Sequence, residues 1–477
     1  MQNLLWNEKV LRLLTLSAVV AWSTPSEVPA LAQTTKSSQQ FHQEAIELAN
    51  SGQWKAAVPL LEKAVELDQK NISLHNDLGV VYQKLNDFKR SLLHYQAAAK
   101  IQPEDAATLH RLGLAYYRVS DITKAIEAIT EALKQDPDYT LARNDLGTIL
   151  LKHNKIMQAA SVYGEAVRLN PKDDGAHNDY GVVLTRIGDV TEARQHFKQA
   201  TELNPKNADA QYNYALSLVA AGRLADAQGH YQAALEVQPN YADAHYNLGR
   251  CLARQGKYSK AIASYDTVTK IKPDYADAYY HKGRALMALG KTKQAISVLS
   301  KALRHRQNYL DVHLLLGKAL AEVGNYSLAA AQFEAVLRLD NEHAEAQLLK
   351  AIASIHLGKF EEAVLHSNEA LRIKPDWAEA MRQLAWLLAT CPDNSIRDPE
   401  RAAELAEKAQ AQVQRDLAKA LDTRAAVYAR AGQFPDATAL ATKALDESHD
   451  KELSDEIQKR LELYQKEKPY TLPSKEQ

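Results

Sequence analysis

The sequence predicts an all-α solenoid, a linear stack of about twelve similar helical pairs. Small residues recur at fixed places every 34 residues, and turn-forming residues recur between them. The composition agrees, because Ala and Leu are abundant while Gly and Pro are sparse, and only 6 Phe stand beside 22 Tyr. A period between roughly 20 and 50 residues is typical of proteins in which each repeat packs only on its neighbours.

Two places in each repeat always hold a small residue when places are counted from Ser38. The eighth place holds Ala45, Gly79, Gly113, Gly147, Gly181, Ala215, Gly249, Gly283, Gly317, Ala351, Ala385 and Ala425. The twentieth place holds Ala57, Ser91, Ala125, Ala159, Ala193, Ala227, Ala261, Ala295, Ala329 and Ala363, and after an insertion of about five residues in repeat 11 the corresponding residues are Ala402 and Ala437. Two antiparallel helices can approach closely where neither carries a bulky side chain, so these places predict the helix crossing inside each repeat.

The twenty-fourth place is bulky where the eighth and twentieth are small. It holds Tyr95, Tyr163, Phe197, Tyr231, Tyr265 and Phe333 in six of the repeats. We expect these side chains to fill the space between neighbouring helical pairs as core residues.

The predicted turns are marked twice in each repeat. Gly is the usual residue at the fifteenth place, with Asn86 and Asn154 in two repeats, and both residue types tolerate the left-handed conformation that ends a helix. Proline recurs at the thirty-second place, as in Pro103 and Pro273, where the missing N–H stops the second helix.

Residues 1–32 differ from the rest of the chain and predict a secretory signal peptide. Lys9 and Arg12 precede the apolar stretch 13–22, and Ala30-Leu31-Ala32 before Gln33 fits the small-x-small cleavage pattern. The apolar stretch is shorter than the roughly 20 residues of a membrane-spanning helix. We therefore expect an exported chain, periplasmic or secreted, with a short linker at 33–37; an uncleaved membrane anchor is the alternative.

Composition and motifs argue against several functional classes. A net charge of −1 gives no broad basic surface for nucleic acid. The 16 His lack metal-ligand spacing, and no phosphate-binding or dinucleotide-binding loop is found, so we expect no catalytic, cofactor or metal site.

Cys251 and Cys391 lie about four repeats apart, too far for a disulfide, and are predicted to be free thiols. Cys391 sits beside Pro and Asp in a loop, which would suit a reactive thiol, but without a neighbouring His or second Cys a structural role is favoured.

The residue pattern at these places resembles that of the tetratricopeptide repeat (TPR) family. Repeat 7 shows the pattern best, with His245-Tyr246-Asn247-Leu248-Gly249, then Ala261, Tyr265 and Pro273. The resemblance covers 38 to about 450 and implies a right-handed superhelix, with repeats starting near 38, 72, 106, 140, 174, 208, 242, 276, 310, 344, 378 and 418. The stretch Ala385-Trp386-Leu387-Leu388-Ala389-Thr390-Cys391-Pro392-Asp393 resembles the terminal repeat pair of many bacterial TPR proteins. An amphipathic segment, 451–466, is predicted to cap the array, and 467–477 to form a flexible tail.

The resemblance also implies where a partner binds. In the family the first helix of each repeat lines the concave side, and the second, fifth, sixth and ninth places contact an extended peptide. The candidate partner-binding residues are Tyr212, Asn213, Tyr246, Asn247, Arg250, Tyr280, His281, Arg284 and Lys318. Asp243 and Asp277, at the second place, are expected to offset the cationic charge, and earlier repeats with Asn-Asp pairs are expected to be more acidic. The alternative is a solvated helix face whose exposed charge pairs contribute only about 0–1 kcal/mol each.

The function that these observations favour is an exported scaffold or adaptor that binds proteins or extended peptides. One alternative is the periplasmic arm of an envelope polysaccharide or pilus export machine, which differs mainly in its partner. An enzyme with a repeat arm is disfavoured, because a catalytic domain needs on the order of 100 residues outside the repeats. Nucleic acid is not an expected partner, and self-association stays open.

Overall fold

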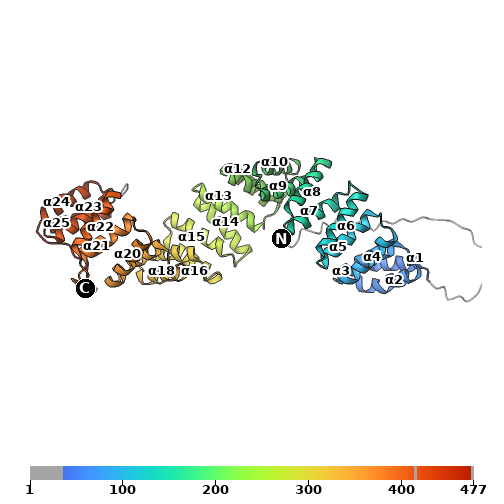
Figure 1. Ribbon diagram of the computed structural model, residues 1–477, viewed down its shortest axis with the longest axis horizontal. Coiled ribbons are helices and arrows are strands. Elements are labelled where there is room, and N and C mark those ends of the chain that lie inside the picture. The colour runs from blue at the N-terminus through green and yellow to red at the C-terminus, as the bar shows by residue number, and fades with distance from the viewer. Residues whose placement is uncertain (1–35, 413–415, 474–477) are drawn as a thin grey trace, which may run out of the picture. The chain divides into compact units, whose positions relative to one another are not determined.

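The computed structural model describes residues 36–412 and 416–473, and the predicted signal peptide lies outside these residues. Within the described ranges the regular structure consists of 25 α-helices and no strand (Figure 1). This confirms the predicted all-α class. The chain divides into two compact parts, which we call the N-terminal body, up to Pro239, and the C-terminal body, from Asn240.

In the N-terminal body the helices alternate as first and second helices of six repeats. They are α1 (Ser38–Asn50), α2 (Trp54–Leu67), α3 (Ile72–Lys84), α4 (Phe88–Ile101), α5 (Ala106–Arg118), α6 (Ile122–Gln135), α7 (Thr140–Lys152), α8 (Ile156–Leu169), α9 (Asp174–Ile187), α10 (Val190–Leu203), α11 (Ala208–Ala220) and α12 (Leu224–Val237).

The C-terminal body continues the alternation through six further pairs and ends with one additional helix. Its helices are α13 (Ala242–Arg254), α14 (Tyr258–Ile271), α15 (Ala276–Ala288), α16 (Thr292–His305), α17 (Leu310–Glu322), α18 (Tyr326–Leu339), α19 (Ala344–His356), α20 (Phe360–Ile373), α21 (Ala378–Thr390), α22 (Pro399–Gln412), α23 (Leu417–Arg430), α24 (Phe434–Asp446) and α25 (Lys451–Tyr464).

Helix crossings within the repeats lie at the small residues. The Ser91 hydroxyl, at the twentieth place, donates to the Gly79 carbonyl oxygen at 2.8 Å, which joins this place directly to the eighth. A Cβ atom added to Gly147 would lie 2.5 Å from Cζ of Tyr163, far inside van der Waals contact. The bulky residue at the twenty-fourth place therefore covers the eighth-place glycine of its own repeat. The sequence led us to expect that this residue fills the space between neighbouring pairs; the structure shows that it also packs inside its own repeat.

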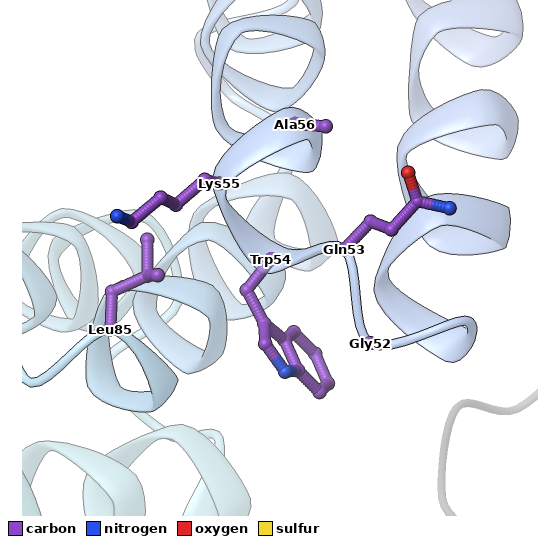
Figure 2. A pocket seen from close by; sticks show the side chains of 6 residues that line it. All are labelled: Gly52, Gln53, Trp54, Lys55, Ala56 and Leu85. Atoms are coloured by element: carbon purple, nitrogen blue, oxygen red, sulfur yellow. The ribbon is translucent and has the colours of Figure 1, made fainter.

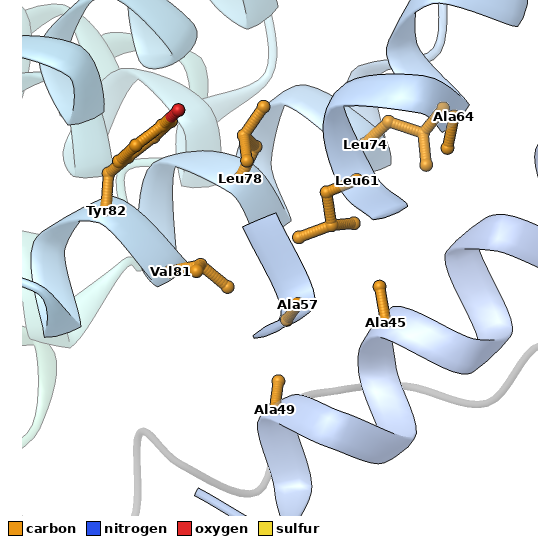
Figure 3. Packing of buried hydrophobic residues seen from close by; sticks show 9 residues of the cluster. All are labelled: Ala45, Ala49, Ala57, Leu61, Ala64, Leu74, Leu78, Val81 and Tyr82. Carbon is orange, nitrogen blue, oxygen red and sulfur yellow. The ribbon is translucent and has the colours of Figure 1, made fainter. Parts of the chain in front are cut away.

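The first hydrophobic cluster shows how one repeat joins the next (Figure 3). Ala45 of α1 and Ala57 of α2 are fully buried at the crossing inside repeat 1. Leu61 of α2 packs in the same cluster as Leu74 and Leu78 of α3 in repeat 2. Burying one such leucine side chain contributes about 1.5–3 kcal/mol, so the contact between repeats is mainly hydrophobic.

Both ends of the first helices follow local rules. Several begin at an Asn or Asp whose side chain caps the first turn; the Asp105 carboxylate, for example, accepts the Thr108 N–H at 2.9 Å. Their C-terminal turns contain a left-handed residue at the fifteenth place, such as Asn154 (φ 57°) and Gly188 (φ 101°). Ser120 adopts the same conformation (φ 65°), although the sequence analysis did not single it out.

The C-terminal end is closed by α25, which packs against α24. Ile457, Leu461 and Tyr464 of this helix are buried in one cluster with α23 and α24. Arg460 holds the Asp422 carboxylate of α23 through two hydrogen bonds of 2.9 and 3.0 Å, and both side chains are only 6% exposed. Removing one partner of such a buried pair costs about 3–5 kcal/mol, so the pair fixes how the cap sits on repeat 12.

The segment after α25 makes contacts that the prediction of a flexible tail did not include. The Leu472 N–H donates to the Thr390 carbonyl oxygen at 2.8 Å, and Arg430 donates to the Tyr470 carbonyl oxygen at 2.8 Å. Part of the predicted tail thus lies against α21 and α23. In the described residues no helix has the length and apolar character needed to cross a membrane.

The crossing predicts unequal effects of one substitution at two helical glycines. Gly147→Ala should destabilise the chain by about 1–3 kcal/mol, because the new methyl group collides with the Tyr163 ring. Gly229→Ala in α12 is the matched control, since nothing lies within 4 Å of its added Cβ, and it should stabilise by about 0.5–1 kcal/mol. Urea denaturation followed by far-UV circular dichroism compares them, and equal shifts of the two midpoints would contradict the role of the crossing.

Candidate functional site

A pocket of about 330 Å³ lies in the C-terminal body between the first helices of repeats 7 and 8. We call it the arginine pocket. Its lining residues are Arg250, Ala253 and Arg254 of α13, Tyr258 and Tyr265 of α14, and His281, Arg284, Ala285 and Ala288 of α15. Three of the predicted partner-binding residues, Arg250, His281 and Arg284, are therefore brought together here.

Aromatic rings form one wall of the arginine pocket. The ring of His281 stacks on Tyr265, with centroids 6.0 Å apart and planes 22° apart. The Tyr246 ring lies edge-on to the His281 ring, with centroids 5.5 Å apart. It is tilted against the Tyr265 ring, with centroids 6.2 Å apart. The wall is rigid and mostly apolar, so it can pack against the aliphatic part of a ligand.

Two exposed arginines provide the polar edge of the site. The guanidinium of Arg250 lies 5.6 Å from the centre of the Tyr246 ring, and that of Arg284 lies 5.7 Å from the centre of the Tyr280 ring. Each cation–π contact joins the fifth and ninth places of one repeat and contributes about 0.5–1 kcal/mol. Asp243 and Asp277 pair with Lys272 and Arg306 and not with these arginines. The Tyr280 hydroxyl takes one hydrogen bond from Arg284, and the remaining N–H groups can meet a ligand.

His281 is neutral at physiological pH because of its surroundings. Burial is the larger cause, and together with the charges of Arg250 and Arg284 it lowers the pKa of this imidazole to about 4. The negative charge of Asp277 raises the pKa of His281, but by less than burial and the arginines lower it. The shift therefore reports mainly a desolvated ring, and the positive charge that suits an anionic ligand comes from the two arginines beside it.

The hydroxyl of Tyr265 distinguishes repeat 7 from a related repeat. Tyr265 is fully buried, and its hydroxyl has no hydrogen-bond partner in the part of the chain that the structure describes. At the same place in repeat 4, the Tyr163 hydroxyl pairs with the ninth-place residue Thr148 at 3.1 Å. In repeat 7 the ninth place is Arg250, a donor that cannot accept a hydrogen bond. An unpaired buried hydroxyl costs about 1–3 kcal/mol. A ligand acceptor could pair with it once the side chains that cover the hydroxyl move aside.

Two of the second-place aspartates, Asp243 and Asp277, do not pair with the arginines as expected, because each has a cation of its own. Asp243 pairs with Lys272 at 3.1 Å. Asp277 accepts from Arg306 at 3.1 Å and from the Tyr309 hydroxyl at 2.6 Å. Although burial would raise the pKa of Asp277, these two donors hold it below its ordinary value.

The other predicted partner-binding residues lie elsewhere. In the C-terminal body, the Asn247 side-chain amide donates to the Asp243 carbonyl oxygen at 3.0 Å, and Lys318 forms an ion pair with Glu345 at 2.7 Å. Neither lines the arginine pocket.

Tyr212 and Asn213 belong to the N-terminal body. The Tyr212 ring lies 6.0 Å from the Tyr231 ring, and the Asn213 amide donates to the Asn178 side-chain oxygen at 2.9 Å. The Asn178–Asn213 contact follows a pattern of that body, in which a fifth-place residue meets the sixth-place residue of the next repeat, whereas Tyr212 and Tyr231 belong to the same repeat. His110 and Asp145, 2.8 Å apart, follow the same pattern.

Histidines in the N-terminal body form pairs that spacing along the sequence did not reveal. The Nδ1 atoms of His75 and His94 lie 3.3 Å apart, and those of His177 and His196 lie 2.9 Å apart. The described residues contain no group of three or more His, Cys, Asp or Glu side chains placed to hold a metal ion. The pairs act as hydrogen bonds between the two helices of one repeat.

Two other features have simpler interpretations. A pocket of about 410 Å³ lies at the turn between α1 and α2 and is lined by Gly52, Gln53, Trp54, Lys55, Ala56 and Leu85 (Figure 2). Lys55 is its one charged residue, so it lacks converging polar groups. Cys251 and Cys391 are buried and are not joined in a disulfide, and burial raises the pKa of the Cys391 thiol, which favours a structural role over a reactive one.

Sequence reasoning missed two parts of the arginine pocket. Arg254 occupies the thirteenth place, which the resemblance does not associate with peptide contacts. Tyr265 was assigned to the core, correctly for its ring, but its unpaired hydroxyl depends on which residue stands at the ninth place. The sequence does carry a signal for this unpaired hydroxyl: repeat 7 has Arg at the ninth place and Tyr at the twenty-fourth, whereas repeat 4 has Thr and Tyr.

Comparison with family models identifies the fold. Models described as tetratricopeptide repeat match residues 144–208, 186–227, 212–276 and 314–378, and others match 252–319, 106–139 and 72–105. A model described as TPR repeat matches 47–86. Together they extend over 47–139 and 144–378, and the chain belongs to the tetratricopeptide repeat family.

Several solved structures are similar to this chain. The crystal structure of YrrB, described as a TPR protein with an unusual peptide-binding site, is 27% identical over 39% of this chain and 95% of its own, with a TM-score of 0.36. PilF of Pseudomonas aeruginosa is 20% identical over 44% of this chain and 97% of its own, with a TM-score of 0.38. Yeast Tom70 is 15% identical over 90% of this chain and 95% of its own, with a TM-score of 0.34. No curated protein sequence matches.

Family membership supports a general function. TPR arrays are scaffolds for protein–protein interaction, and the fold of this chain supports proteins or peptides as its partners. The arginine pocket adds a local chemistry to that general function, because it combines cations, an unpaired donor and an aromatic wall.

The His281 environment predicts a titration far from that of an ordinary imidazole. The His281 signal should not titrate between pH 7.5 and 5.5 and should have a midpoint near 4, whereas an unperturbed side chain titrates near pH 6.5. Since the unfolded chain binds this proton more readily, the contribution of His281 to stability is present above about pH 6.5 and is lost as the pH falls toward 4. NMR of histidine-labelled chain, with His281→Gln to assign the signal, measures the midpoint. A midpoint above 6 would contradict the buried environment of His281 beside the two arginines.

Proposed function

We propose that this chain is an exported scaffold that holds an extended, acidic peptide segment of a partner protein at the arginine pocket. The observation that carries the proposal is the convergence of Arg250, Arg284 and the unpaired Tyr265 hydroxyl on one pocket. All three carry hydrogen-bond donors, and the two guanidinium groups cannot accept a hydrogen bond, so an acceptor group on a ligand complements the pocket.

A carboxylate is the ligand group that best fits these donors. It accepts several hydrogen bonds at once and pairs well with planar guanidinium groups. Hydrogen bonds to charged groups contribute about 1.5–3 kcal/mol each, more than contacts between neutral groups. The neutral ring of His281 adds no charge, so the arginines supply the electrostatic attraction while the aromatic wall packs on the methylene groups of the ligand.

The N-terminal residues support the exported location that we propose. A positive segment with Lys9 and Arg12, a short apolar stretch and a small-x-small site at residues 30–32 occur in the order of a secretory signal. We place the mature chain in the bacterial periplasm or a comparable envelope compartment, where it would organise a protein complex.

The peptide site predicts a dependence on charge at defined positions. A fluorescent, unstructured peptide with repeated Glu should bind the chain at least about tenfold more tightly than the same peptide with Gln, because Gln loses the charged hydrogen bonds. Arg250→Glu with Arg284→Glu should abolish the difference, and added salt should weaken binding of the Glu peptide. Fluorescence anisotropy measures both affinities.

The matched control for this double charge reversal is Lys301→Glu with Arg304→Glu. Both control residues are exposed on α16 and lie outside the pocket lining, so this variant should retain discrimination between the Glu and Gln peptides. Equal binding of the two peptides by the wild-type chain, or equal loss in both variants, would reject the arginine pocket as the site.

Export predicts a defined mature N-terminus. In a bacterial host the chain should be recovered from the periplasmic fraction beginning at Gln33, because the cleavage pattern ends at Ala32. Ala30→Arg with Ala32→Arg should block processing and leave the longer chain. N-terminal sequencing of the fractionated chain decides the matter, and an unprocessed wild-type chain would favour the membrane-anchor alternative.

A further inference from the structure

The last described residues of the chain lie across the closing repeats, which are repeats 11 and 12 (α21–α24). We call residues 470–472 the tail segment. They follow α25 without regular secondary structure, and Tyr470 and Leu472 are half-buried while Thr471 is exposed. The segment is held by both its backbone and its side chains, as an extended peptide would be in a groove.

Backbone contacts fix the tail segment at two points. The Leu472 N–H donates to the carbonyl oxygen of Thr390, the last residue of α21, at 2.8 Å. Arg430 of α23 donates to the Tyr470 carbonyl oxygen at 2.8 Å and to the Thr471 hydroxyl oxygen at 3.0 Å. The same guanidinium also donates to the Ala389 carbonyl oxygen at 2.7 Å, so Arg430 bridges the tail segment and the end of α21.

The side chains of the tail segment alternate between the apolar surface of the repeats and a polar contact. The Tyr470 ring lies 5.7 Å from the Trp386 ring, and the Arg460 guanidinium lies 5.6 Å from the Tyr470 ring. Leu472 packs in the hydrophobic cluster that contains Cys391 and Phe360. Residues two apart thus contact the apolar surface, while Thr471 between them meets Arg430, which is the pattern of an extended chain.

The contacted residues occupy repeat places that recur elsewhere. Trp386 is the ninth-place residue of repeat 11, the place that holds Arg250 in repeat 7. Arg430 is the thirteenth-place residue of repeat 12, the place that holds Arg254 in repeat 7. The tail segment therefore lies on the helix face that carries the arginine pocket in other repeats, but here that face offers an aromatic ring and a backbone-binding guanidinium.

We propose that the closing repeats form a second peptide-binding groove, selective for an extended Tyr-x-Leu segment, and that the tail segment occupies it in the chain as synthesised. This groove is separate from the proposed acidic-peptide site, because none of its contacts involves the arginine pocket. A partner protein with a Tyr-x-Leu segment competes with the tail segment for Trp386, Arg430 and the cluster around Cys391. A short tether gives the tail segment an effective concentration on the order of millimolar, so competitors bind well only after it leaves.

A peptide of residues 467–477 added in trans tests the groove. The opened chain is the full chain with Tyr470→Ala and Leu472→Ala, which removes the anchoring side chains without shortening the protein. Labelled peptide should bind the opened chain at least about tenfold more tightly than the wild-type chain, whose groove is already filled. Fluorescence anisotropy gives both affinities, and circular dichroism checks that the opened chain keeps its helices.

Peptide variants test the selectivity. A peptide with Tyr470→Ala should bind the opened chain at least about tenfold more weakly, whereas Lys468→Ala, a change at an exposed residue without a side-chain contact, should bind as the unchanged peptide does. A chain ending at residue 466 provides a second opened form and should give the same affinities. Absence of trans binding to both opened forms, with their helical signal intact, would overturn the proposal.

A further variant separates this groove from the arginine pocket. Arg250→Glu and Arg284→Glu, placed on the opened chain, should leave binding of the tail peptide unchanged. Loss of tail-peptide binding in that variant would overturn the claim of a separate groove. Conversely, loss of acidic-peptide binding alone would concern only the arginine pocket.

Discussion

The structure depends on the close approach of a bulky side chain to a backbone that lacks a Cβ atom. In repeat 4 the Tyr163 ring occupies the space that a side chain at Gly147 would need, and in repeat 7 Tyr265 does the same at Gly249. Because each repeat packs only on its neighbours, no distant core can correct a misplaced helix pair. This contact fixes the crossing of the two helices, and with it the direction in which the first helices present their ninth-place residues.

Most of the fold could be predicted from the sequence because packing and turn geometry restrict residue type at single places. The crossing needs a small residue at the eighth place, and the left-handed turn favours Gly or Asn at the fifteenth. Ser120 escaped notice because serine has no comparable preference, although it adopts the same positive φ. The twenty-fourth place was recognised as core, but its detailed contact was not, since periodicity shows which places are bulky and not which residue each one covers.

The candidate site was less predictable because it depends on contacts between specific pairs. Arg250 and Arg284 could be found by their common place, and the structure brings them to one pocket. Lys318 has the same place and a similar charge, yet Glu345 of a later repeat engages it. The tail segment lay beyond prediction for a related reason: its contacts join residues far apart in the sequence, and no repeat period relates Tyr470 to Trp386.

The ninth place carries a consequence for how such a protein can change over evolutionary time. Thr148, Arg250 and Trp386 occupy it in three repeats. Thr148 pairs with a tyrosine hydroxyl, Arg250 leaves one unpaired beside a cation, and Trp386 contacts the ring of Tyr470 in the tail segment. The helix crossing does not involve this place. One codon there can therefore exchange the recognised chemistry while the small residues of the crossing stay in place. The cost is about 1–3 kcal/mol where a buried tyrosine hydroxyl loses its partner, so recognition can diversify repeat by repeat within a single gene.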